Sequence, residues 1–306
     1  MVLPIETFIQ EDAVMSTTMI APQSGIKQSE STAGIQVRRL SSALGAEISG
    51  IDLGAGVDDA TFETIHDALM EHQVIFFRDQ DMSVERHLEL AKRFGNPTYS
   101  KKLPKYDGND YVSLIQSNGS KINVGGRWHT DNTDFKEPPM GAVLYCEETP
   151  SSGGDTLFAS MYAAYNALSE GLKRHLDTLV AQHDNSLVVL RFAGTEFVGD
   201  KGLSVEAPVE HPVVRVHPVT GRRALYVNSS YTRRILDVPD VESRYLLSML
   251  MEHVMTPDFQ VRFEWQPGSV AIWDNRCTQH YAPNDYTEPR RMRRVQIDGD
   301  VPRGIS

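Results

Sequence analysis

The first hundred residues alternate between stretches with a strand period and stretches with a helical period. Residues 35–40 and 45–50 alternate apolar and polar side chains, which predicts two short antiparallel strands joined by a turn. Apolar residues three and four positions apart predict one helix from the N-cap Asp58 through Gln73 and a second from the N-cap Ser83 to Gly95. A continuous apolar run between them predicts a buried strand.

The rest of the chain is dominated by short strand-like runs. Residues 96–127 are polar and rich in glycine and proline, which predicts mostly loop with one strand near 111–115. Further strands are expected at 141–146, 213–216, 224–227, 260–265, 269–273 and 293–297. Helices are expected after three N-cap candidates, namely Ser160, Ser169 and Asp240.

The order of these elements favours a β-rich fold. Strands interrupted by a few helices suit a jelly-roll, or double-stranded β-helix, cupin-like core with flanking helices better than a parallel sheet. Residues 1–34 are rich in Ser, Thr, Gln, Pro and Gly, and we expect a disordered tail. We expect a single domain over residues 35–306, with an irregular, lid-like insertion around 184–210.

Composition and charge narrow the class of partner. The 306 residues are 40% hydrophobic and 23% charged, as in an ordinary globular protein. A net charge of −11 argues against a nucleic-acid partner. No apolar run approaches the ~18 residues needed to span a bilayer, so we expect no membrane partner. The two cysteines, Cys146 and Cys277, lie in apolar stretches, which fits a reducing cytoplasm.

The stretch from Trp128 to Asp131 carries the candidate chemistry. On a strand, the His-x-Asp pattern would place the side chains of His129 and Asp131 on one face. His280, far along the chain, is the candidate third ligand. Two histidines and one carboxylate on one face leave the opposite coordination positions open, as in non-haem Fe(II) oxygenases. Taken alone, a His-x-Asp tripeptide is more often a hydrogen-bonded pair or a pair of exposed strand residues than a metal site.

Several further motifs surround this stretch and carry a resemblance. They are Pro138-Pro139, Gly153-Gly154-Asp155-Thr156, the run from His211 to Pro218, Tyr226-Val-Asn228, Arg234-Ile-Leu-Asp237, the run from Trp273 to His280, and a terminal arginine cluster. In order and spacing, over residues 35–300, the chain resembles the taurine dioxygenase (TauD/TfdA) family. The resemblance implies dependence on Fe(II), 2-oxoglutarate and O2, with His129, Asp131 and His280 as the iron ligands.

The resemblance also implies residues for 2-oxoglutarate. Thr156 matches the threonine that hydrogen-bonds a carboxylate of this co-substrate. Arg290 matches the arginine that binds its distal carboxylate, for which a planar guanidinium is suited. Arg294, four residues later on the same strand face, matches the arginine that binds the anionic group of the substrate. Counting from His280 instead would select Arg291, which we otherwise expect on a solvated face with Arg293.

The expected reaction hydroxylates a C–H bond of a small anionic substrate and releases succinate and CO2. The substrate is expected to be a carboxylate, a sulfonate or a sulfate ester, and a leaving group on the hydroxylated carbon would then be lost. Positions that contact taurine in the family carry Gly125, Ser100, Leu103 and Tyr231 here. Because these do not reproduce the polar contacts of the taurine enzyme, we expect taurine to be a poor substrate.

Other interpretations remain open on the sequence alone. A zinc-dependent hydrolase could use the same three ligands, although it would need neither Thr156 nor the arginine pair. A non-enzymatic cupin-like binding module is the second alternative. Lys101, Lys102 and Arg127 are candidates for the pocket entrance, although surface lysines usually serve only solubility. A homo-oligomer, dimer or tetramer, is expected from the family.

Overall fold

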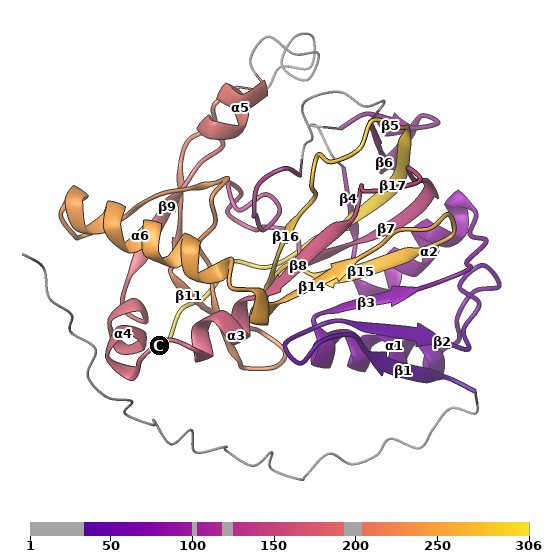
Figure 1. Cartoon of the computed structure of the whole chain (residues 1–306), viewed down its shortest axis with the longest axis horizontal. Helices are drawn as coiled ribbons and strands as arrows, with labels where there is room; N and C mark the ends of the chain where they lie inside the picture. The colour runs from indigo at the N-terminus through magenta and orange to yellow at the C-terminus, as the bar shows by residue number, and fades with distance from the viewer. Residues whose placement is uncertain (1–33, 100–102, 118–124, 193–203, 306) are drawn as a thin grey trace, which may run out of the picture. The chain divides into compact units, whose positions relative to one another are not determined.

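The largest sheet forms the base of the fold and has nine strands. The computed structural model describes residues 34–99, 103–117, 125–192 and 204–305 (Figure 1). The strand order is β1-β2-β3-β15-β7-β17-β6-β5, with β4 paired to β17. The strands are β1 (Gln36–Arg39), β2 (Ala46–Ser49), β3 (Val74–Phe77), β4 (Pro97–Thr98), β5 (Lys105–Tyr106), β6 (Asn109–Ser117), β7 (Gly141–Glu148), β15 (Val270–Asp274) and β17 (Arg290–Ile297).

A second, three-stranded sheet packs against this one. It consists of β14 (Gln260–Phe263), β8 (Thr156–Ser160) and β16 (Thr278–Tyr281), in that order. Aromatic side chains join the two sheets: Phe76 of β3 stacks on Phe263 of β14 with ring centroids 3.9 Å apart and contacts Phe158 of β8 edge-on at 5.7 Å. Two sheets around one core give the expected jelly-roll architecture.

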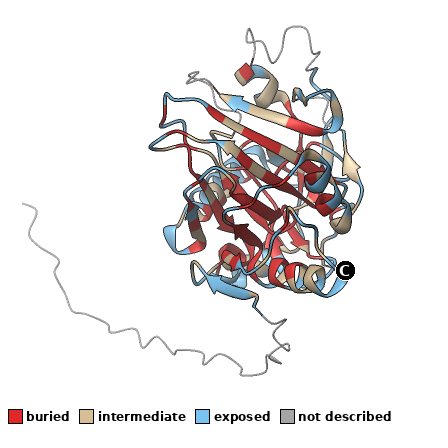
Figure 2. Cartoon of the chain, turned by 90° about the vertical axis from the view of Figure 1, so that its right-hand side faces the viewer, coloured by how far each residue is buried: buried red, intermediate tan, exposed pale blue. Residues whose placement is uncertain are grey.

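Helices cover the other face of the large sheet. α1 (Asp59–His72) and α2 (Val84–Phe94) pack buried residues such as Ile65 and Leu90 against Ile75, Val143 and Val295 of that sheet. The central strands are therefore buried on both faces, which explains why β3 reads as a continuous apolar run instead of an alternating one. Figure 2 shows the buried residues following the strands through the middle of the fold.

A third buried cluster lies among the remaining elements. They are α3 (Met161–Asn166), α4 (Glu170–Leu176), α5 (Ser186–Phe192), α6 (Asp240–Val254), the 3-10 turn η1 (Pro257–Phe259), the sheet β10-β9-β13 (Val209–Pro212, Val180–His183, Thr232–Ile235) and the pair β11-β12 (Val214–Val216, Arg223–Leu225). Residues from α3, α6 and β12 share one apolar core. No helix among the described residues is long and apolar enough to cross a membrane.

Most expected helix starts are confirmed, and one is wrong. The side chains of Asp58, Ser83, Ser160 and Ser169 each accept a backbone N–H three residues on, as N-caps do. Asp240 is instead the first residue of α6, and Pro239 occupies the cap position without a side-chain hydrogen bond. At that first position the Asp240 carboxylate still lies at the positive end of the helix dipole.

The expectation for the segment 184–210 needs correction, and the expected N-terminal tail lies almost entirely outside the described residues. The segment 184–210 is not irregular throughout, because it begins with α5 and ends in β10. Its lid function stays a prediction. The predicted tail, apart from Gly34, lies outside the described residues, and so do Ser100, Lys101 and Lys102.

Candidate functional site

Two histidines face each other where β16 meets the segment before β7. His129 and His280 form an isolated antiparallel bridge, with His129 N donating to His280 O at 3.1 Å and His280 N to His129 O at 2.8 Å. Directly opposed residues of an antiparallel pair project to the same side. The two imidazole rings accordingly lie with their centroids 4.1 Å apart.

Asp131 completes the group. Its Oδ1 lies 3.6 Å from His129 Nε2 and 3.9 Å from His280 Nε2. The three candidate ligand atoms all lie within 4.8 Å of one another. Because ligands about 2 Å from a shared ion and at right angles are about 3 Å apart, this triangle fits one face of an octahedral metal after small adjustments. The sequence-predicted triad therefore meets in space.

Protonation of the histidines suits metal binding. The Nδ1 of His129 lies 2.7 Å from the carbonyl oxygen of Arg127, and a carbonyl only accepts. Nδ1 must therefore carry the proton, which leaves a lone pair on Nε2. Burial and then the neighbouring His129 ring lower the pKa of His280 to about 3, so the His280 imidazole is neutral near pH 7. Neutral imidazole is the form that binds metals.

The Asp131 carboxylate is held charged and oriented. Burial raises its pKa, but the positive charge of Arg294 lowers it, and the net result is a pKa well below the ordinary value. Arg294 Nη1 donates to Oδ2 at 3.1 Å, and Gln296 Nε2 lies 3.4 Å from the same oxygen. With Oδ2 occupied, Oδ1 is the oxygen presented toward the imidazoles.

Asn275 fixes the backbone of Asp131, and this corrects the expectation of a strand at His-x-Asp. Only His129 makes a bridge, and a turn begins at Asp131, two residues later. Asp131 N donates to Asn275 Oδ1 at 2.8 Å, while Asn275 Nδ2 donates to the carbonyls of Asp131 and Pro139, each at 3.0 Å. The buried amide thus replaces the missing strand partner and holds the carboxylate beside the histidines.

Replacing Asn275 with alanine is expected to weaken metal binding by about 10- to 100-fold, the usual effect of removing a group that orients a ligand. Titration with Mn(II), followed by the electron paramagnetic resonance of the free ion, measures the change. Asn166→Ala, at an exposed position on α3, is the matched control. A folded Asn275→Ala protein with unchanged Mn(II) affinity would contradict the role.

Thr156 and Arg290 lie in the same pocket as the triad. Thr156 Oγ1 accepts a hydrogen bond from Trp265 Nε1 at 3.0 Å, so its own hydroxyl proton can be donated into the pocket. Arg290 is buried and donates from Nε to the carbonyl of Gly154 at 3.0 Å, but it forms no ion pair with any described carboxylate. A buried guanidinium without a counter-ion is suited to bind an anion.

Arg291, the alternative by spacing, points elsewhere. Its Nε donates to Glu147 Oε2 at 2.7 Å, and its guanidinium lies 5.3 Å from the Tyr106 ring centroid. It does not line the pocket. Strand alternation explains the difference, because Arg290 and Arg294 share one face of β17 while Arg291 and Arg293 share the other.

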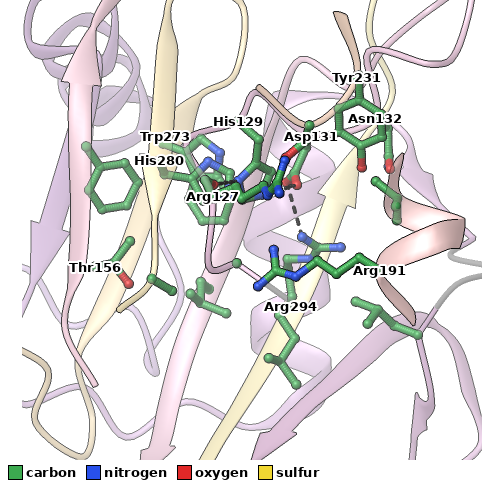
Figure 3. Close-up of a pocket in the computed structure, with 18 of the residues that line it drawn as sticks. Arg127, His129, Asp131, Asn132, Thr156, Arg191, Tyr231, Trp273, His280 and Arg294 are labelled. Carbon is green, nitrogen blue, oxygen red and sulfur yellow. Dashed lines mark hydrogen bonds and ion pairs between the residues drawn. The ribbon is translucent and has the colours of Figure 1, made fainter. Parts of the chain in front are cut away.

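The pocket is a cavity of about 140 Å³. Arg294, Tyr231 and Gly125 line it, as the sequence suggested, whereas Ser100 lies outside the described residues. Asn228 supports Tyr231 from behind, since its Oδ1 accepts the backbone N–H of Tyr231 at 3.0 Å. Figure 3 shows Tyr231 beside Asn132 and Asp131, and a dashed line joins Asp131 to Arg294.

One wall of the pocket is not predicted by the sequence. Leu187, Val188, Arg191 and Phe192 of α5 line the pocket. Their spacing of three and four residues is that of one helix face. This signal is present in the sequence, but the helix is only seven residues long and is followed by a glycine-rich segment, which favours loop for the whole stretch.

A second cluster of metal-binding residue types has a different role. His217, Asp274 and Cys277 are all buried and close together. His217 Nδ1 accepts the backbone N–H groups of Val219 and Thr220, so Nε2 carries the proton and donates to Asp274 Oδ2 at 3.0 Å. Arg276 also donates to both oxygens of Asp274. These hydrogen bonds fix the turn between β15 and β16, which sets the position of His280.

The comparisons with known proteins agree with this geometry. The family described as "Taurine catabolism dioxygenase TauD, TfdA family" matches residues 36–296. An alpha-ketoglutarate-dependent sulfate ester dioxygenase from Pseudomonas putida is 39% identical, covering 89% of this chain and 92% of that protein. An alkylsulfatase from Acinetobacter baylyi is 38% identical, covering 89% of this chain and 88% of that protein.

Solved structures give the same result. A crystal structure of a taurine dioxygenase described as putative, from Burkholderia xenovorans, superposes with a TM-score of 0.78 at 37% identity, covering 88% of this chain and 94% of that one. The structure of AAD-2 in complex with Mn(II) and N-oxalylglycine has a TM-score of 0.73 at 28% identity, covering 88% and 98%. The chain belongs to the TauD/TfdA family and is a 2-oxoglutarate-dependent dioxygenase.

Proposed function

We propose that the metal is Fe(II), held by His129, Asp131 and His280. Two imidazoles and one charged carboxylate on one face are the donor set of non-haem Fe(II) oxygenases. With 2-oxoglutarate and O2, the bound iron would supply the oxidising power that amino-acid side chains lack. The protein's contribution is to orient the ligands and to hold the co-substrate and the substrate beside them.

Thr156 and Arg290 are the proposed 2-oxoglutarate residues. The hydroxyl proton of Thr156 can be donated to one carboxylate, and the Arg290 guanidinium, which has no ion-pair partner among the described residues, can bind the other. The AAD-2 neighbour binds N-oxalylglycine, an analogue of 2-oxoglutarate, together with Mn(II). A zinc hydrolase or a binding module would have no use for such a keto-acid site.

The proposed substrate is a small organic anion with an apolar portion. The observation that carries this proposal is the pocket itself, in which arginines and apolar side chains together surround the triad. Arg294 lies beside Asp131 and can bind the anionic head group. Relatives are named for sulfate esters, sulfonates and phenoxypropionate. Hydroxylation of a carbon that carries a sulfate group would release an aldehyde and sulfate.

Taurine is expected to be a poor substrate. A Cβ placed on Gly125 would lie 2.9 Å from the Cβ of Ala282, so the polar side chain that the taurine enzyme carries here has no room. Each hydrogen bond that the taurine amine fails to make would cost about 1–3 kcal/mol, and every 1.4 kcal/mol corresponds to about a factor of ten.

A substrate panel tests this. We expect succinate formation with hexyl sulfate or phenoxypropionate to exceed that with taurine at least about tenfold in kcat/KM. Reactions without added anion give the uncoupled background. Equal kcat/KM values for taurine and the best member of the panel would contradict the proposed substrate class.

Two further properties are proposed from the family alone, namely a cytoplasmic location and a homo-oligomer, either dimer or tetramer. Light scattering coupled to gel filtration tests the second of these.

A further inference from the structure

The pocket holds more positive charge than the proposed function uses. Among the described residues that line it, four are arginines and Asp131 is the only carboxylate. Arg290 is assigned to 2-oxoglutarate and Arg294 to the head group of the substrate. A divalent metal and the 2-oxoglutarate dianion neutralise each other. The proposed function assigns no role to the remaining two arginines of the lining, Arg127 and Arg191.

Arg127 is fixed to the metal site by its backbone. Its carbonyl oxygen lies 2.7 Å from Nδ1 of His129, and its N–H donates to the carbonyl of Gly125 at 2.9 Å. Its side chain is exposed, and it forms no ion pair with any carboxylate in the described parts of the chain. The guanidinium therefore lies at the mouth of the pocket, next to a metal ligand.

Arg191 approaches the same mouth from α5. In Figure 3 its side chain extends from the helix into the pocket. Arg127 and Arg191 both line the pocket, and Figure 3 draws them in the same part of it. Burial and then the positive charge of Arg127 also lower the pKa of Arg191. Two neighbouring cations repel, and an anion between them would remove that repulsion. Arg294 donates to Asp131 at 3.1 Å, beside the candidate metal ligands.

The apolar residues on α5 indicate what joins the two anion sites. Leu187 and Val188 lie on the pocket-lining face together with Arg191, one turn earlier in the helix. An apolar spacer could contact these side chains while an acidic group at its end meets Arg191. Arg127 and Arg191 are thus placed to bind a second acidic group of the substrate, distinct from the one that Arg294 binds.

We propose that Arg127 and Arg191 form a second anion-binding subsite at the mouth of the pocket, and that this enzyme prefers dianionic substrates in which an apolar spacer joins two acidic groups. The proposal rests on the proposed function, since it assumes that Arg294 binds the first anionic group near the metal. Its occupant is the second acidic group of the substrate, such as a terminal carboxylate.

A matched pair of ligands tests the subsite. Hexyl sulfate carries one charge, and the sulfate ester of ω-hydroxyhexanoate has the same reacting end with a carboxylate at the other. We expect kcat/KM to be about tenfold higher for the dianion. This is the effect of one additional charge-assisted hydrogen bond, made by the second acidic group at the partly exposed mouth of the pocket. Arg127→Gln, Arg191→Gln and the double variant should reduce kcat/KM more for the dianion than for hexyl sulfate. Arg174→Gln, at an exposed position on α4, should change neither value.

Binding without turnover gives an independent readout. Calorimetry on protein loaded with Mn(II) and N-oxalylglycine measures the Kd of each ligand, and the preference for the dianion should fall as salt rises. Equal Kd values for the two ligands would overturn the proposed subsite but not the proposed function. The same holds if the Arg127 and Arg191 variants lose affinity equally for both ligands. If neither ligand binds or is turned over, the proposed substrate class fails and the subsite fails with it.

Discussion

Replacing His280 with alanine is expected to reduce 2-oxoglutarate-dependent succinate formation to the level of the metal-free protein. The substitution removes one of three ligand atoms that lie within 4.8 Å of one another. It leaves the fold intact, because the bridge between His280 and His129 is made by backbone N–H and C=O groups. Succinate formation and the Mn(II) dissociation constant, measured together, separate loss of metal from loss of chemistry.

His175→Ala is the matched control, since His175 is an exposed histidine on α4. It should retain both metal affinity and activity. Circular dichroism and the melting temperature of the His280→Ala protein establish that it is folded. Substantial activity in a folded His280→Ala protein would show that the metal is held elsewhere, and the assignment of the triad would then be wrong.

The sequence predicted the members of the triad but not how they are held together. His129, Asp131 and His280 follow from residue type and family resemblance, and they meet in the structure. The expected strand at His-x-Asp is absent. The hydrogen bonds that replace it, chiefly those of the Asn275 amide with the Asp131 backbone, join positions 144 residues apart. Local periodicity carries no information about such long-range hydrogen bonds.

The elements were predictable where the local signal was strong. Four N-caps were correct because a side-chain oxygen and the N–H three residues later lie within one turn. α5 was missed because seven residues are too few to establish a helical periodicity. Strands such as β9, which pairs with both β10 and β13, depend on partners distant in sequence. The short, partly polar segments that form these strands show no clear alternation of apolar and polar residues.

Arg290→Ala is expected to raise the KM for 2-oxoglutarate about a hundredfold. A carboxylate that accepts two charge-assisted hydrogen bonds from this guanidinium would lose about 3 kcal/mol, which corresponds to roughly a factor of a hundred. Arg290→Lys should recover only part of this binding energy, because an ammonium group cannot donate in a planar, bidentate fashion. Initial rates at several 2-oxoglutarate concentrations, with the organic anion saturating, measure the effect.

Arg291→Ala is the matched control, one residue further along β17. It removes an ion pair with Glu147 in which the arginine side chain is 36% exposed, and such pairs contribute little to stability. Because Arg291 lies on the other face of the strand, the KM for 2-oxoglutarate should stay within about twofold of the wild-type value. A large increase in this KM for Arg291→Ala with none for Arg290→Ala would mean that the alternative register, counted from His280, describes the co-substrate site.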